Sequence, residues 1–201
     1  MALLFRWVVI CMAVLVQARS VTAKDGDTVA GRTVAELVTA LDDDDRTTRC
    51  AAVRSLGAFE QSGAKALAGA LSHHDPAVRY LAAVHLGRIG GEELSKATDR
   101  LIGLAEKDDS EAVRMAVSFA LCRGGKVESH LPRLIAGLQA SERAMACSAA
   151  ELIGMLGPAA SEARERLQTV RDANAPGSDG DYHIGGAAAA ALRKIDAESV
   201  D

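Results

Sequence analysis

The chain has 201 residues, 49% of them hydrophobic, which is enough for one domain with a sizeable core. Its net charge of −4 gives no general attraction for nucleic acid or anionic lipid. Only 3% of the residues are aromatic, so the stacking platforms that bind sugars and single-stranded nucleic acids are not expected.

The first residues have the order of a secretory signal peptide. Arg6 provides a positive charge, Trp7–Val16 is an uncharged apolar run, and small residues follow at Ala18 and Ala23. A helix that spans a bilayer needs about 20 apolar residues, so this run is too short for a membrane anchor. We predict cleavage after Ala23; cleavage after Ala18 and a retained, buried amino-terminal helix are the alternatives.

The signal peptide would direct the protein to the periplasm or the extracellular space, and its cleavage would leave no membrane span. The expected organisation is a signal peptide over 1–23, a linker over 24–32, a repeat array over 33–196 and a tail over 197–201. The remaining cysteines are too few and odd in number for a disulfide framework, so we interpret them as buried, unpaired thiols. They are Cys50, Cys122 and Cys147.

From Thr33 onward, two kinds of apolar helix alternate. The first kind is short, and Thr33 and Glu36 have the spacing of a capping box at its first copy. The short helices are predicted at Val34–Leu41, Ala64–Leu71, Thr98–Ala105, Leu131–Leu138 and Ala163–Val170. Each is followed by a second, longer helix, so five helix pairs are expected.

The second helices align with one another at a regular spacing. Their aligned starts are Arg49, Arg79, Arg114, Ala146 and Gly185, which lie 30, 35, 32 and 39 residues apart. Four residues before each start stands an acidic or helix-capping residue. These residues are Asp45, Asp75, Ser110, Glu142 and Asp181. Periods in this range with helical spacing predict an all-α solenoid.

One copy carries a complete pattern, Asp-x-x-Val-Arg-x-x-Ala-Ala-x-x-Leu-Gly-x-Ile-Gly, at Asp75–Gly90. The pattern resembles the HEAT repeats of the phycobilisome-lyase-like type, and the resemblance covers Thr33 to about Asp196. It implies a right-handed α-solenoid, the architecture of scaffolds, adaptors and occasional enzymes. It also implies a ladder in which arginines pair with acids of neighbouring repeats. The ladder residues are Asp45, Arg49, Asp75, Arg79 and Arg114.

One face of each second helix is uniformly apolar. Leu56, Leu86 and Leu121 share a slot in it. At about 100° per residue the apolar slots form a single stripe, so we predict that this stripe faces the core.

The opposite face of the second helices, which we call the inner column, varies between copies and should line the concave surface. In the second and third copies it carries large apolar side chains beside arginines, a combination typical of protein-binding hot spots. The candidate partner-binding residues are Tyr80, Val84, Arg88, Met115, Phe119 and Arg123. The alternative is that the array curves tightly and these side chains pack between neighbouring repeats.

No motif in the sequence predicts a catalytic residue, a metal or a cofactor. No histidine belongs to a His-Glu pair, and the loops at 42–45 and 174–181 lack the ligand spacing of a calcium loop. Phosphate-binding and nucleophile motifs are also missing. We therefore predict a monomeric, non-catalytic scaffold that binds a protein or peptide rather than nucleic acid. A lyase- or hydroxylase-type enzyme or accessory subunit is the alternative that the resemblance implies.

Overall fold

The computed structural model describes residues 28–197, and the predicted signal peptide lies outside these residues. Within the described part the chain is all-helical, with only an isolated bridge between Val29 and Arg32 in extended structure. The elements are α2 (Val34–Thr39), η1 (Ala40–Asp42), α3 (Arg46–Ala58), α4 (Gln61–Ala70), α5 (Pro76–Ile89), α6 (Gly91–Lys96), α7 (Thr98–Lys107), α8 (Glu111–Arg123), α9 (Val127–Gly137), α10 (Arg143–Leu156), η2 (Gly157–Ala163), α11 (Arg164–Ala173) and α12 (Tyr182–Asp196).

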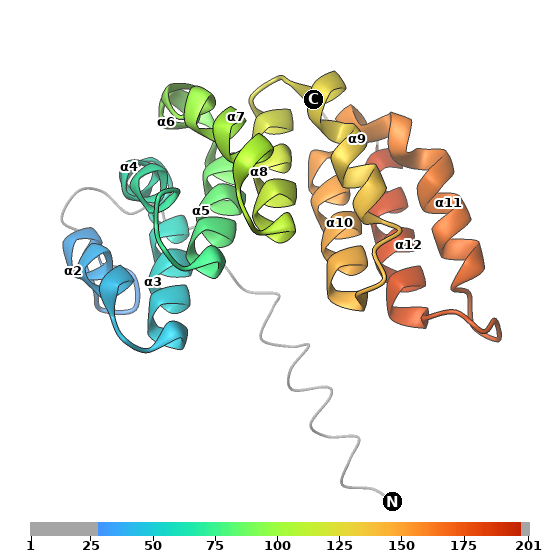
Figure 1. Cartoon of the computed structure of the whole chain (residues 1–201), viewed down its shortest axis with the longest axis horizontal. Coiled ribbons are helices and arrows are strands. Elements are labelled where there is room, and N and C mark those ends of the chain that lie inside the picture. Colours follow the sequence, from blue (N-terminus) through green and yellow to red (C-terminus); the bar gives the residue numbers. More distant parts are fainter. Residues whose placement is uncertain (1–27, 198–201) are drawn as a thin grey trace, which may run out of the picture.

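The helices form a curved array of antiparallel pairs (Figure 1). The pairs are α2–α3, α4–α5, α7–α8, α9–α10 and α11–α12. The second helices stack on one another along the array, and the first helices cover them from outside. The predicted all-α solenoid of helix pairs is therefore confirmed. The short helix α6, which lies between the second pair and α7, was not predicted.

Most of the second helices begin where their capping residues predict. The side chains of Asp45, Asp75, Ser110 and Asp181 each accept a hydrogen bond from a backbone N–H in the first turn. These bonds satisfy donors that have no partner within the helix. Glu142 occupies the same slot before α10, but its side chain makes no such bond. The longer glutamate side chain is a poor helix cap, and α10 begins without one.

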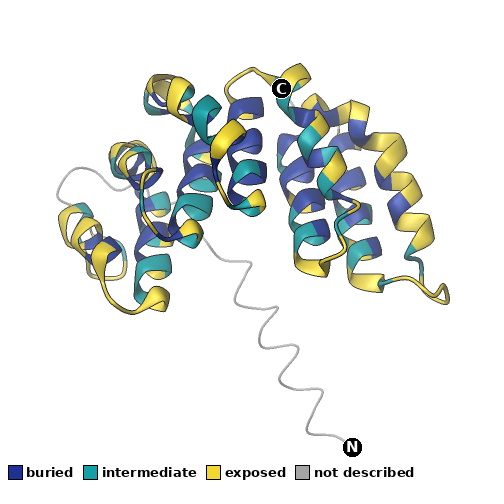
Figure 2. Ribbon diagram, in the orientation of Figure 1, coloured by how far each residue is buried: buried dark blue, intermediate teal, exposed yellow. Residues whose placement is uncertain are grey.

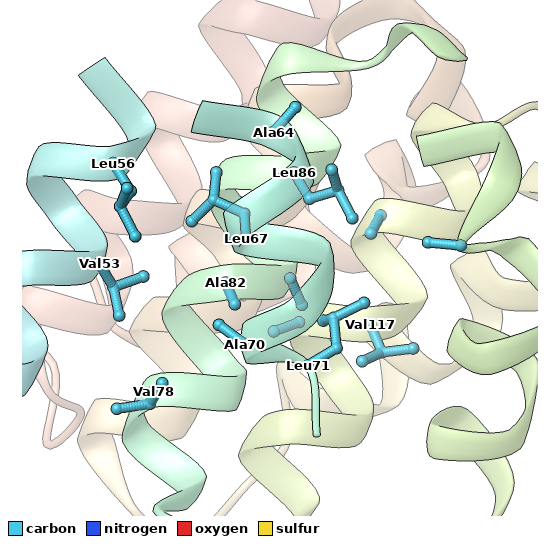
Figure 3. Packing of buried hydrophobic residues seen from close by; sticks show 14 of the residues in the cluster. Val53, Leu56, Ala64, Leu67, Ala70, Leu71, Val78, Ala82, Leu86 and Val117 are labelled. Atoms are coloured by element: carbon cyan, nitrogen blue, oxygen red, sulfur yellow. The ribbon is translucent and has the colours of Figure 1, made fainter. Parts of the chain in front are cut away.

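The predicted apolar stripe is buried. Leu56 and Leu86 have no exposed surface, and Leu121 is 2% exposed. They pack in one cluster with apolar side chains such as Leu67 of α4 and Leu71, which directly follows α4 (Figure 3). Figure 2 shows buried residues concentrated on the second helices, whereas the outer faces of α2 and α11 are exposed. The phase of the second helices is therefore as predicted.

The core divides into two clusters, and the division falls within α8. Leu121 and Val117 belong to the first cluster, which extends back to α2. Met115, Phe119 and Cys122, on another face of α8, belong to the second cluster with α9, α10 and α12. Figure 1 shows the same division as two groups of helices, α2–α8 and α9–α12. The fourth pair thus packs on the side of α8 that was assigned to the inner column.

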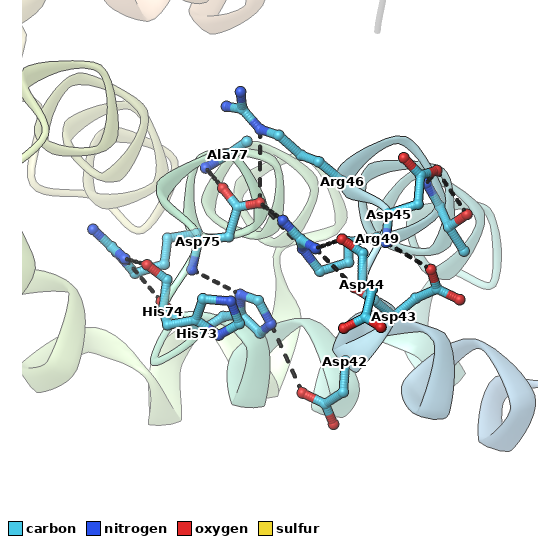
Figure 4. Close-up of polar contacts among 12 residues, drawn as sticks. Asp42, Asp43, Asp44, Asp45, Arg46, Arg49, His73, His74, Asp75 and Ala77 are labelled. Atoms are coloured by element: carbon cyan, nitrogen blue, oxygen red, sulfur yellow. Dashed lines mark hydrogen bonds and ion pairs between the residues drawn. The ribbon is translucent and has the colours of Figure 1, made fainter.

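A ladder of arginine–aspartate pairs joins the first three repeats along one edge. The Arg49 guanidinium donates to Asp75 at 3.2 Å and 2.6 Å, and the Arg79 guanidinium donates to both oxygens of Asp108 at 2.7 Å and 2.8 Å. Each arginine also donates to two carbonyls of the loop before its own helix, as Arg49 does to Asp43 and Asp44 (Figure 4). Each rung therefore fixes a helix to its own loop and to the next repeat.

Two of the predicted ladder residues act differently from the prediction. Arg114 reaches no acid of the fourth repeat; it donates to Glu111 of its own helix and to the carbonyl of Asp108. Asp45, in the first repeat, caps its own helix through Thr48 and pairs with no arginine of another repeat in the described chain. The ladder stops at the junction where the core divides, and Arg143 and Asp181 then pair the last two repeats.

The ladder carboxylates make the fold sensitive to acid. Burial raises the pKa of Asp75 and of Asp108, but the hydrogen bonds from Arg49 and Arg79 and the adjacent positive charges outweigh it, so both pKa values are lowered. A carboxyl group with a lowered pKa stabilises the fold above its unfolded value of about 3.9, and this contribution is lost as the pH falls through the folded pKa. We expect the urea midpoint to fall on acidification below about pH 4, and to fall less in Asp75→Asn. If the urea midpoint fell equally with pH in the two proteins, this role of Asp75 would be contradicted.

One described stretch, Arg143–Ala173, is long and apolar enough to cross a membrane by length and composition alone. It comprises α10, η2 and α11, and Gly157, with φ of 60°, separates α10 from the rest. In the array the apolar side chains of this stretch, including Leu152, Ile153 and Leu167, are part of the second core cluster.

Candidate partner-binding groove

The structure separates the six candidate partner-binding residues into three groups. Met115 is 1% exposed and Phe119 is fully buried, so the prediction that they lie on an accessible wall is wrong. Tyr80 and Val84 are half-buried. The remaining two, Arg88 and Arg123, are exposed. The alternative of close packing between repeats is the one that holds for α8.

The burial of the α8 residues has a direct structural cause. A Cβ built on Gly137 of α9 would lie 2.8 Å from the sulfur of Met115, and one on Gly87 of α5 would lie 2.9 Å from the ring of Phe119. Glycine at both positions therefore lets neighbouring helices approach α8 closely. Val84 packs against both core clusters, so it sits at the edge of this closed region.

Tyr80 of α5 lies near Ser148 and Glu151 of α10. The pKa of the Tyr80 hydroxyl is raised, first by burial and then by the nearby Glu151 carboxylate. A hydrogen bond with Ser148 of α10 acts in the opposite direction but does not outweigh them. Because α5 and α10 belong to the second and fourth repeats, this contact spans the third. The inner column is buried at α8, and its open part lies on the earlier repeats.

An open groove of about 440 Å³ lies between α3 and α5. Its lining includes polar, aromatic and aliphatic side chains and one thiol, and we call it the α3–α5 groove. The lining residues are Arg46, Thr47, Cys50, Arg54, Ala77, Tyr80 and Leu81. Three of them, Arg46, Cys50 and Arg54, are spaced four residues apart, so they follow one face of α3. Neighbouring apolar area and polar groups of this kind are typical of peptide-binding surfaces.

Both charged residues in the lining of the groove are arginines, and their guanidinium groups have donors to spare. The Arg46 side chain is 67% exposed and approaches Asp75 only to 3.6 Å. Arg54 is exposed and makes no ion pair with any residue of 28–197. This contrasts with the ladder, where Asp75 is used by Arg49 at 2.6 Å.

A second hollow, of about 280 Å³, continues the same seam toward the carboxyl ends of α3 and α5. It is lined in part by Gly57, Glu60, His85 and Arg88. His85 packs directly on α3, since a Cβ built on Gly57 would lie 2.2 Å from its Nδ1. Burial, together with the charges of Arg88 and Arg54, lowers the pKa of His85 to about 4. His85 is therefore neutral at pH 7, and the two guanidinium groups near it form no ion pair within residues 28–197.

Another hollow, of about 400 Å³, lies between α7, α8 and α9. Its one arginine, Arg133, already pairs with Glu111, which also binds Arg114 beside the hollow. The α3–α5 groove thus has arginines with unused donors, whereas the lining arginine of this hollow is already paired.

The remaining reactive residues form no site of their own. Among residues 28–197 no three His, Cys, Asp or Glu side chains come together as a ligand set for a metal. The described cysteines are free thiols, as predicted; Cys122 is buried, while Cys50 and Cys147 are half-buried. Burial raises the pKa of Cys122 to about 12, so this thiol is not a nucleophile at neutral pH.

The comparisons with known proteins concern the part of the chain that contains the groove. Residues 34–122 match the family model for HEAT repeats. The matched segment spans the first three helix pairs, and therefore both helices of the α3–α5 groove. The helical array is also similar to the crystal structure of an engineered protein, at 19% identity over 81% of this chain and 78% of that one, with a TM-score of 0.48. No curated protein matches the chain.

Proposed function

We propose that the HEAT array is a non-catalytic scaffold that binds a peptide segment of a protein partner in the α3–α5 groove. HEAT repeats commonly serve in protein–protein interaction, which supports this class of function. The observation that carries the proposal is the groove itself: two arginines with unused donors lie beside the half-buried Tyr80 and Leu81. We further propose that binding occurs outside the cytoplasm, on the basis of the apolar run Trp7–Val16. The lyase- or hydroxylase-type alternative has no specific observation in its favour.

The proposal is tested by filling the groove. A library of random peptides displayed on phage would be selected against the full chain, and the selected peptides measured by fluorescence anisotropy. Ala77 lines the groove, so the indole of Ala77→Trp would occupy apolar surface that a bound peptide contacts. This substitution is expected to weaken the binding of the selected peptides by at least about tenfold.

The array supplies a matched control for this substitution. Ala144 occupies the slot in the fourth repeat that Ala77 occupies in the second, and it is exposed on α10. Ala144→Trp should leave peptide affinity unchanged, and thermal unfolding of both variants would confirm that they fold. Selection of no peptide above background, or equal affinity of both variants for every selected peptide, would overturn the proposal.

A further inference from the structure

We propose that the segment bound in the α3–α5 groove is acidic, with two carboxylate side chains three or four residues apart on either side of an apolar residue. This inference rests on the proposed function and adds the chemistry of the partner. It derives from the charge of the groove, the unused donors of its arginines and their spacing along α3.

The groove has a charge opposite to that of the whole protein. The chain carries a net charge of −4, yet the lining of the groove contains Arg46 and Arg54 and no acidic residue. Arg88 extends the positive charge into the adjoining hollow, where Glu60 is the one acid in the lining. Positive charge gathered at one groove of an acidic protein attracts an acidic partner and disfavours a basic one.

The arginines of the array divide by how much of their hydrogen-bonding capacity is used. Arg49 and Arg79 each donate to a carboxylate of the next repeat and to two backbone carbonyls. Arg54 and Arg88 have no hydrogen bond or ion pair with residues 28–197, although a guanidinium has five N–H donors. Their planar donor groups fit carboxylates in a bidentate arrangement.

The spacing of the arginines sets the spacing of the acids. Arg46 and Arg54 are eight positions apart on one helix, which is about 12 Å at 1.5 Å per residue. An extended peptide rises about 3.3 Å per residue, so about 12 Å corresponds to three or four residues. Between the two arginines the groove presents Cys50, Tyr80 and Leu81. An apolar side chain between the two acids would therefore meet an apolar surface.

The test uses the peptides selected in the preceding experiment. Their sequences should be enriched in Asp or Glu at the stated spacing around an apolar residue. In anisotropy measurements Arg54→Gln should lower the affinity for these peptides by roughly five- to tenfold, because it removes one charge-assisted contact. Arg54→Lys should recover part of this affinity. Arg193→Gln, an exposed arginine on α12 far from the groove, makes the same change in net charge and should have less than about a twofold effect.

The outcomes separate this inference from the proposed function. Peptides that are neutral or basic but still sensitive to Ala77→Trp would overturn the inference and leave the groove as the binding site. Acidic peptides with equal sensitivity to Arg54→Gln and Arg193→Gln would also overturn it. A fluorescein-labelled single-stranded oligonucleotide would be measured in parallel. If it bound through Arg54 while no peptide was selected, both the inference and the proposed function would fall.

Discussion

Replacing Phe119 by alanine is expected to lower the free energy of unfolding by about 3–5 kcal/mol. The ring is fully buried at the meeting point of the two core clusters, and it lies against Gly87 of α5. Its removal would leave a cavity where the second, third and fourth repeats come together. Had the ring lined an open binding surface, the same substitution would cost little stability.

Urea denaturation followed by circular dichroism would measure the effect, with Tyr182→Ala as the control. Tyr182 is an aromatic residue of the same array that is 65% exposed, so its removal should change the free energy of unfolding by less than about 0.5 kcal/mol. A loss below about 1 kcal/mol for Phe119→Ala would place the ring outside a packed junction.

Replacing Asp108 by alanine should destabilise the array by about 3 kcal/mol, because it leaves the Arg79 guanidinium without its carboxylate. The Asp108 side chain is 3% exposed and that of Arg79 is 15% exposed, so water compensates poorly for the lost pair. Asp108 also accepts a hydrogen bond from the backbone N–H of Ser110, which helps to shape the loop before α8.

The matched control for this prediction is the exposed pair formed by Glu92 and Lys96, whose side chains are 77% and 60% exposed. Glu92→Ala should leave the free energy of unfolding almost unchanged, because water and salt screen an exposed pair. The double variant Asp108→Ala/Arg79→Met should recover part of the stability lost in Asp108→Ala, since it removes the unpaired charge. Equal losses for Asp108→Ala and Glu92→Ala in urea denaturation would show that the ladder does not stabilise the fold.

The phase of the helices could be predicted from the sequence because it depends on local pattern. Leu56, Leu86 and Leu121 occupy a slot that any stacked helix pair must bury, whatever the curvature of the array. The burial of Met115 and Phe119 could not be predicted in the same way. A large apolar residue on the second face of α8 is compatible with a binding surface or with a packed neighbour. Only the angle at which the fourth repeat packs on α8 decides between them.

The candidate site was predictable to the level of the inner column but not to the individual side chains. Arg54 is in that column, yet its unpaired state depends on which carboxylates the folded array brings near it. Asp108 was missed for a related reason: it lies two residues before the helix cap Ser110, outside the slot that Asp75 occupies. The pairing of Arg79 with Asp108 follows from how the third repeat stacks on the second.

The most direct test of a concave surface closed at α8 and open at the α3–α5 groove uses the protein's own thiols. The folded full chain would be treated with an aromatic disulfide reagent at neutral pH, and the modified cysteines identified by mass spectrometry over time. Cys50 lines the groove and should react, whereas Cys122 is buried in the second cluster and should react at least about a hundredfold more slowly until urea unfolds the array. Modification of Cys122 as fast as Cys50 in the absence of urea would contradict the packing of the fourth repeat on α8.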